Sequence, residues 1–171
     1  MTFIIQKPKQ GQAQLVEDHF TVVQAENPIP EAGSILVALP IWQANKTQLS
    51  ARAQQGELGV WLSPDCNPEE LAGDLHTLKL IAFYFPVFKF GQGYSGAVLL
   101  RTRFGFTGEI RAFGDIWRDQ LFYLARCGFT QFKLKPGKSL EDALEGFNDF
   151  TTPYQTSADE LPTIFKLRHG T

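Results

Sequence analysis

Short apolar runs alternate with longer, more polar stretches along most of this chain. Five runs are continuous enough to be strands buried on both faces, at residues 35–39, 58–62, 80–85, 109–113 and 129–134. The stretches between them carry apolar residues at helical spacing and predict helices near 42–55, 68–78, 95–104 and 116–127. This alternation predicts a mainly parallel sheet built from sequential βα units.

The expected fold class is therefore α/β, with about five neighbouring parallel strands. Such units either curl into a half-barrel or lie open with helices on both faces, and the pattern leaves both arrangements open. Residues 1–33 are irregular in pattern, with short edge or hairpin strands at Phe3–Ile5 and Phe20–Val23. Ser139 is a candidate N-cap for a last helix to about residue 150, and residues 151–171 read as an extended C-terminal arm. We expect one domain over residues 1–171.

Composition narrows the functional classes. Hydrophobic residues make up 43% of the 171 residues, charged residues 20%, and the net charge is -2, which gives no basic field for nucleic acid. The sequence has no apolar run long enough for a signal peptide or a membrane span, so we expect a cytoplasmic protein. Cys66 and Cys127 form no C-x-x-C pair, and the three histidines are scattered. We therefore expect no metal site and no cofactor.

A glycine-rich turn lies between the third predicted strand and the following helix. Its residues, Gly91 to Gly96, match G-x-G-x-x-G, a pattern in which glycines let the backbone approach a pyrophosphate. Residues 86–90 separate the turn from the strand, unlike a dinucleotide fingerprint. Two other interpretations remain: a flexible turn with Ser95 capping the helix, or a small oxyanion bound at the free N–H groups. The candidate anion-binding residues here are Gly91, Gly93, Tyr94 and Ser95.

The second candidate anion-binding site includes an arginine in the middle of the fourth predicted strand. Alternation places Arg111, Phe113 and Asp115 on one face, with Asp115 at the carboxyl end, where α/β folds gather ligand sites. A buried arginine needs a partner. Either Asp115 caps the next helix while Arg111 closes an ion pair, with Asp119 as the better-placed carboxylate, or Arg111 clamps an anion in an open cleft. Arg118 and Asp119 would then lie on the rim of that cleft.

Apolar and aromatic side chains suggest a partner. Aromatic residues make up 13% of the chain, including 15 Phe. The helix predicted at 95–104 is apolar nearly all round, because Val98, Leu99 and Leu100 cannot all face one core. We therefore expect a homodimer, or a complex with another protein that covers this helix.

The same central stretch resembles a known family. Its motif residues are Phe85-Pro86-x-Phe88, Gly91-x-Gly93-Tyr94-Ser95-x-Ala97-x-Leu99-Leu100-Arg101-x-Arg103-x-Gly105-Phe106-x-Gly108-Glu109, Arg111-Ala112-x-Gly114-Asp115, Arg118-Asp119-Gln120-Leu121-Phe122 and Arg126-Cys127-Gly128-Phe129. Weaker matches lie at Leu71-Ala72-x-Asp74-Leu75, Tyr154-Gln155 and Asp159-Glu160. Together they resemble the bacterial domain of unknown function 934 family.

The resemblance implies a role in sulfur metabolism. Members of the family are usually encoded beside sulfite reductase genes and are labelled probable oxidoreductases of sulfite reduction. It implies an accessory factor that binds sulfite reductase or its electron donor, since nothing in the chain could hold siroheme or an iron–sulfur cluster unaided. A small α/β enzyme or oxyanion-binding protein is the alternative. The chain departs from the family at Phe90, Gln92 and Val98, where an acid and two arginines are usual.

Overall fold

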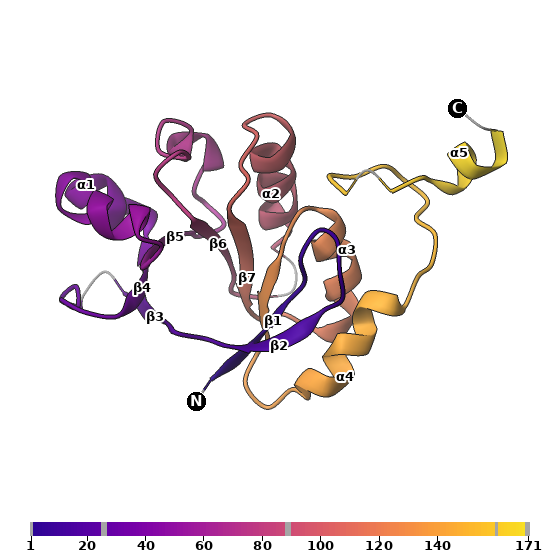
Figure 1. Cartoon of the computed structure of the whole chain (residues 1–171), viewed down its shortest axis with the longest axis horizontal. Coiled ribbons are helices and arrows are strands. Elements are labelled where there is room, and N and C mark those ends of the chain that lie inside the picture. The colour runs from indigo at the N-terminus through magenta and orange to yellow at the C-terminus, as the bar shows by residue number, and fades with distance from the viewer. Residues whose placement is uncertain (1, 25–26, 88–89, 160, 170–171) are drawn as a thin grey trace.

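The computed structural model describes residues 2–24, 27–87, 90–159 and 161–169. These residues form one eight-stranded sheet in the order β2-β1-β8-β7-β6-β5-β4-β3 (Figure 1). The strands are β1 Phe3–Gln6, β2 Gln14–Glu17, β3 Phe20–Val23, β4 Ser34–Ala38, β5 Leu58–Leu62, β6 Leu80–Phe85, β7 Glu109–Gly114 and β8 Gln131–Lys133. Phe88 and Glu160 of the motifs, and the last two residues of the predicted arm, lie outside the described residues.

The five strands expected from apolar runs are confirmed as parallel neighbours, β4 to β8. The short strands expected at Phe3–Ile5 and Phe20–Val23 are present as β1 and β3, whereas the expected total of about five strands and the otherwise irregular N-terminal segment need correction. Residues 3–23 add three strands, of which β3 extends the parallel sheet and β1 and β2 pair antiparallel beside β8. The unexpected strand is β2, which has four residues, Gln-Leu-Val-Glu, and is too short to give a clear apolar period.

The helices follow the predicted order with altered bounds. They are α1 Leu39–Gln54, η1 Pro68–Leu71, α2 Gln92–Thr102, η2 Arg118–Gln120, α3 Leu121–Arg126, α4 Leu140–Glu145, η3 Gly146–Asn148 and α5 Ile164–His169. The helix expected at 68–78 is only one 3₁₀ turn followed by further turns. Ser139 does cap α4, since its Oγ accepts a hydrogen bond from the Asp142 N–H at 3.1 Å.

All the helices that enter the core pack on one face of the sheet. The main core joins Trp42 and Leu49 of α1, Leu100 of α2 and Leu124 of α3 to alternate residues of the central strands, such as Ile81. The opposite face carries a smaller apolar layer made by Leu36, Leu80, Ala82 and Phe113, partly covered by Phe20, Val22 and Trp61. The sheet is thus a curled half-barrel, and helices do not cover both of its faces.

The reason for the curl is the connection from β2 to β3. These strands lie at opposite edges of the sheet, yet only Asp18 and His19 join them. Seven strand spacings in a flat sheet would span roughly 34 Å, whereas three Cα steps reach about 11 Å. The edges must therefore approach one another. Residues 14–23, here called the N-terminal strap, cross the concave face in front of the sheet (Figure 1).

Candidate functional site

Arg111 lies under the N-terminal strap. Its Nη1 donates to Asp18 Oδ1 at 2.9 Å and its Nε to Gln131 Oε1 at 2.9 Å, while Lys133 Nζ contacts Asp18 Oδ2 at 2.7 Å. The Arg111 and Asp18 side chains are 2% and 0% exposed. The buried ion pair is as expected, but the expected partner Asp119 is wrong. The true partner, Asp18, lies 93 residues away, in the two-residue connection between β2 and β3.

Two cations keep the buried carboxylate ionised. Burial alone would raise the pKa of Asp18, but the charges and hydrogen bonds of Arg111 and Lys133 outweigh it, so that its pKa lies below the ordinary value. Burial also lowers the pKa of Arg111, and the Asp18 charge opposes that change. Because the guanidinium is 2% exposed and already bonded, it is not open to an anion from solution.

The other polar candidates at the strand ends also bind groups of the same chain. Asp115 accepts from Lys135 Nζ at 3.2 Å and from the Trp117 indole at 3.0 Å, and it does not cap the next helix, whose N-cap is Trp117. Lys135 and Trp117 together lower the pKa of Asp115. Arg118 forms a two-bond pair with Asp149, at 2.9 and 3.1 Å.

Tyr94 and Asp119 lie in the two helices that follow these strands. The Tyr94 hydroxyl accepts a hydrogen bond from Gln120 at 2.9 Å, and its ring packs against Phe85. Burial raises the pKa of Tyr94. Asp119 lies in η2. Neither residue reaches Arg111, which faces the strap on the concave side.

The glycine turn serves the packing of a helix on the sheet. A Cβ at Gly93 would lie 2.6 Å from the Phe85 ring, and one at Gly96 would lie 2.6 Å from the Phe83 ring. The G-x-G-x-x-G match therefore has a steric reason that involves no phosphate. The helix begins at Gln92 with Gly91 as N-cap, and Ser95 donates to the Gln92 carbonyl within the helix instead of capping it.

Only two of the predicted site residues meet in a pocket. Gly93 and Ser95 line a pocket of about 390 Å³ at the carboxyl ends of β5 and β6, together with Ser63 and Cys66. The Ser63 Oγ lies 3.2 Å from Cys66 Sγ. The expected cluster with Arg111, Asp115, Arg118 and Asp119 does not form there.

Arg101 has a structural role that the sequence reading missed. Its Nη1 donates to the carbonyls of Phe106 and Gly108 at 2.7 and 2.6 Å, and its Nε and Nη2 donate to the Gly128 carbonyl at 3.0 and 2.9 Å. Burial lowers the pKa of Arg101 to about 10. One side chain thus joins three parts of the motif. Leu100 of the same helix is buried, whereas Val98 and Leu99 are half-buried, so that the helix is covered only in part by its own chain and the expected partner stays a prediction.

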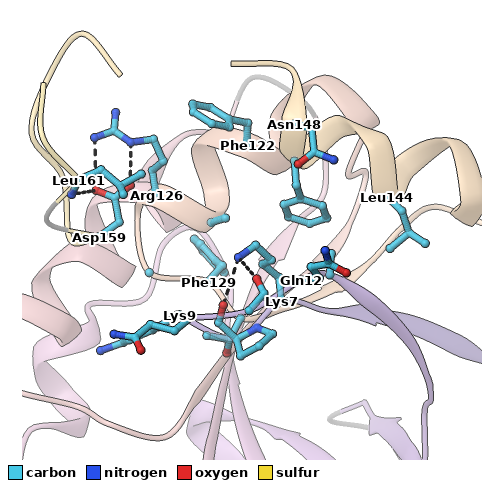
Figure 2. A pocket seen from close by; sticks show the side chains of 18 of the residues that line it. Lys7, Lys9, Gln12, Phe122, Arg126, Phe129, Leu144, Asn148, Asp159 and Leu161 are labelled. Atoms are coloured by element: carbon cyan, nitrogen blue, oxygen red, sulfur yellow. Dashed lines mark hydrogen bonds and ion pairs between the residues drawn. The ribbon is translucent and has the colours of Figure 1, made fainter. Parts of the chain in front are cut away.

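A larger cavity lies at the amino end of β8. It measures about 840 Å³ and lies between the β1–β2 hairpin loop, α3, η3 and the start of the C-terminal arm. Figure 2 places the Arg126–Asp159 pair on one side of it, and Leu144 and Asn148 on the other. Arg126 donates to both carboxylate oxygens of Asp159, at 2.9 and 3.3 Å, and so ties the arm to α3. Sequence reading missed this cavity, although the turn Lys7-Pro8-Lys9 was a signal for its hairpin.

The C-terminal arm extends away from the sheet (Figure 1). Its large apolar side chains are strongly exposed, at 81% for Tyr154, 63% for Phe165 and 62% for Leu167. In α5 the last two alternate with Lys166 and Arg168. The arm therefore presents apolar and basic groups together.

A scan against family models matches residues 59–165 to "Bacterial protein of unknown function (DUF934)". The chain belongs to the DUF934 family. The matched range runs from β5 to α5, and so leaves the N-terminal strap and its Asp18 outside it. No curated protein matches the chain. Within the described part of this DUF934 protein, no helix combines the length and apolarity needed to cross a membrane, and no acidic, histidine or cysteine side chains cluster as metal ligands would.

Proposed function

We propose that this DUF934 protein is a cytoplasmic accessory factor of assimilatory sulfite reduction, which binds sulfite reductase or its electron donor through the C-terminal arm. The exposed apolar arm is the observation that carries the docking role. The link to sulfite reduction is supported by the resemblance of the motif to proteins encoded beside sulfite reductase genes.

The arm has the composition of an interface and few contacts of its own. Tyr154, Phe165 and Leu167 each leave more than half of their surface in water. Aromatic side chains bury about 150–250 Å² each and are enriched in interfaces, so covering them would yield a large share of the binding free energy. Lys166 and Arg168 add positive charge beside them, which favours an acidic partner surface.

The polar side chains at the carboxyl ends of the strands favour a docking role over an enzymatic one. Arg111, Asp115 and Arg118 form ion pairs within the chain, and Tyr94 bonds to Gln120. Side chains held in this way position helices and loops. They do not converge on a space where a substrate could lie.

Growth on defined sulfur sources tests the sulfur assignment. The gene is deleted in the bacterium that encodes it, and the strain is grown on sulfate, sulfite or sulfide alone. Growth restored only by sulfide places the step at sulfite reduction, and normal growth on sulfate removes the assignment. Complementation with the double variant Phe165→Ser, Leu167→Ser then tests the arm, and the matched control is Phe3→Ser, an exposed aromatic on β1. Failure of the arm variant alone would support docking.

An oxyanion-binding role is the second candidate. It is favoured by the pocket at the carboxyl ends of β5 and β6, where Ser63, Cys66 and Ser95 meet the first turn of α2. Sulfite or sulfate should then raise the melting temperature of the protein, and Ser95→Ala should reduce that rise. A melting temperature that does not respond to either anion would exclude this role.

A homodimer is the other possible partner arrangement. The exposed arm offers more apolar surface for it than α2, in which Val98 and Leu99 are half-buried. Light scattering on the purified protein distinguishes the cases: a dimer that Phe165→Ser, Leu167→Ser converts to a monomer would assign the arm to self-association. A monomer in both samples would leave the arm to another protein.

A further inference from the structure

We propose that the cavity of about 840 Å³ at the amino end of β8 binds a small phosphorylated aromatic molecule of the mononucleotide type. This function is separate from the docking role of the arm. Small-molecule sites are usually concave spaces of about 300–1,000 Å³ with a mostly apolar lining and a few placed polar groups. The cavity has this size, and its walls come from four segments of the chain.

One side of the cavity is aromatic. Its lining includes Phe122 of α3, Phe129 before β8, Phe147 of η3 and Phe150 at the start of the arm. The rings of Phe122 and Phe150 lie 5.2 Å apart, and Phe150 is 64% exposed. An exposed ring beside a cavity gains free energy when a flat apolar group covers it. This wall therefore favours a planar ring.

The hairpin side of the cavity is cationic. Lys7 and Lys9 both line it, and in the parts of the chain that the structure describes neither forms an ion pair. Lys7 Nζ donates to the carbonyls of Pro8 and Gly11, at 3.3 and 2.7 Å, which uses two of its three donors. Figure 2 shows these bonds in the middle of the lining. Neutral carbonyl partners leave the positive charge of Lys7 uncompensated.

The lining of the cavity also contains the charged residues Arg126, Asp159 and Glu145. Arg126 is neutralised by Asp159, and Glu145 is the other acidic residue in the lining, on α4. Lys7 and Lys9, both on the hairpin loop, are therefore the basic residues of the lining that have no acidic partner among the described residues. A phosphate monoester carries about −1.5 to −2 charges at neutral pH and accepts several hydrogen bonds. A phosphate joined to a planar ring therefore matches both walls, whereas a free phosphate or an uncharged ring matches only one.

Isothermal titration calorimetry of the purified full chain tests this with FMN and ATP as probes, and inorganic phosphate and adenosine as controls. At least one of the two nucleotides should bind with a micromolar Kd, and each control about tenfold more weakly or worse. Failure of both nucleotides to bind below about 1 mM would overturn the proposal, as would phosphate binding as tightly as they do.

Single variants locate the site. Lys9→Glu should weaken binding about tenfold through lost charge, and Phe150→Ala about tenfold through lost ring contact. Both side chains are exposed, so folding is retained. Lys166→Glu and Phe165→Ala are matched controls on α5, outside the cavity lining, and should bind as the parent does. Unchanged binding in Lys9→Glu and Phe150→Ala would show that the nucleotide binds elsewhere and would refute the site.

Discussion

The two ends of the parallel strands use their charges differently. At the carboxyl ends, Asp115 and Arg118 each have a partner of opposite charge within the chain. At the amino end of β8, Lys7 and Lys9 face a cavity without an acidic partner among the described residues. The charged side chains at the carboxyl ends thus hold the fold together, whereas the two lysines at the amino end of β8 have no partner of opposite charge among the described residues.

The buried ion pair under the strap should show the largest effect. Asp18→Ala leaves Arg111 buried without its carboxylate, and we expect a loss of about 3–5 kcal/mol in the free energy of unfolding. Arg111→Ala should cost about 3 kcal/mol, at the lower end, because Lys133 still contacts Asp18. Urea denaturation measures both.

Two controls sharpen that result. Arg118→Ala, which breaks a more exposed ion pair, should cost about 1 kcal/mol or less. Added sulfate should leave the difference between the parent and Arg111→Ala unchanged. An Arg111→Ala protein as stable as the parent, which had lost a sulfate-induced rise in melting temperature, would instead show that Arg111 binds anions.

Arg101→Ala should give the second-largest loss in the free energy of unfolding. Arg101→Ala leaves the carbonyls of Phe106, Gly108 and Gly128 without this donor, and hydrogen bonds to charged groups contribute about 1.5–3 kcal/mol. We expect a loss of about 3 kcal/mol by denaturation. Arg103→Ala, at the C-cap of the same helix, is the control, since the pair of Arg103 with Glu69 is exposed. Equal losses in the two variants would contradict the structural role of Arg101.

The pH dependence of stability should report Asp18. Its folded pKa lies below its unfolded value of about 3.9, so the folded state binds fewer protons and stability is gained above that value. This contribution is lost as the pH falls from about 4 through the folded pKa. Denaturation of the parent and of Asp18→Asn between pH 7 and pH 2 should therefore show a steeper acid loss in the parent. Parallel curves would argue against an ionised Asp18.

The arm should give the smallest change in stability. Arg126→Ala removes the tie to Asp159, and we expect a loss of about 1 kcal/mol together with faster proteolysis of residues 151–169. Phe165→Ser and Leu167→Ser should change the free energy of unfolding by no more than about 0.5 kcal/mol, because both side chains are exposed. A large loss in either would mean that the arm packs on the body in solution.

The two predicted helix N-caps show how well the start of a helix can be predicted from neighbouring residues alone. Ser139 was identified as an N-cap and is one, because a cap depends on residues within one turn. A cap at Ser95 was one of the interpretations left open, and Ser95 is not a cap, since α2 begins three residues earlier, at Gln92. Within that added turn, Gly93 packs against the Phe85 ring, which belongs to another element.

Local patterns were enough to predict five neighbouring parallel strands and most of the helices between them, but not the order of the strands in the sheet or the single 3₁₀ turn at Pro68–Leu71. Each rests on an apolar run or a helical spacing that neighbouring residues supply. Three features are visible only in the three-dimensional structure: the sheet curls, Asp18 lies against Arg111, and Lys7 and Phe150 line one cavity. Those features arise because two distant sheet edges are joined by two residues, and because a hairpin near one terminus meets an arm near the other. No local pattern encodes contacts between segments more than ninety residues apart.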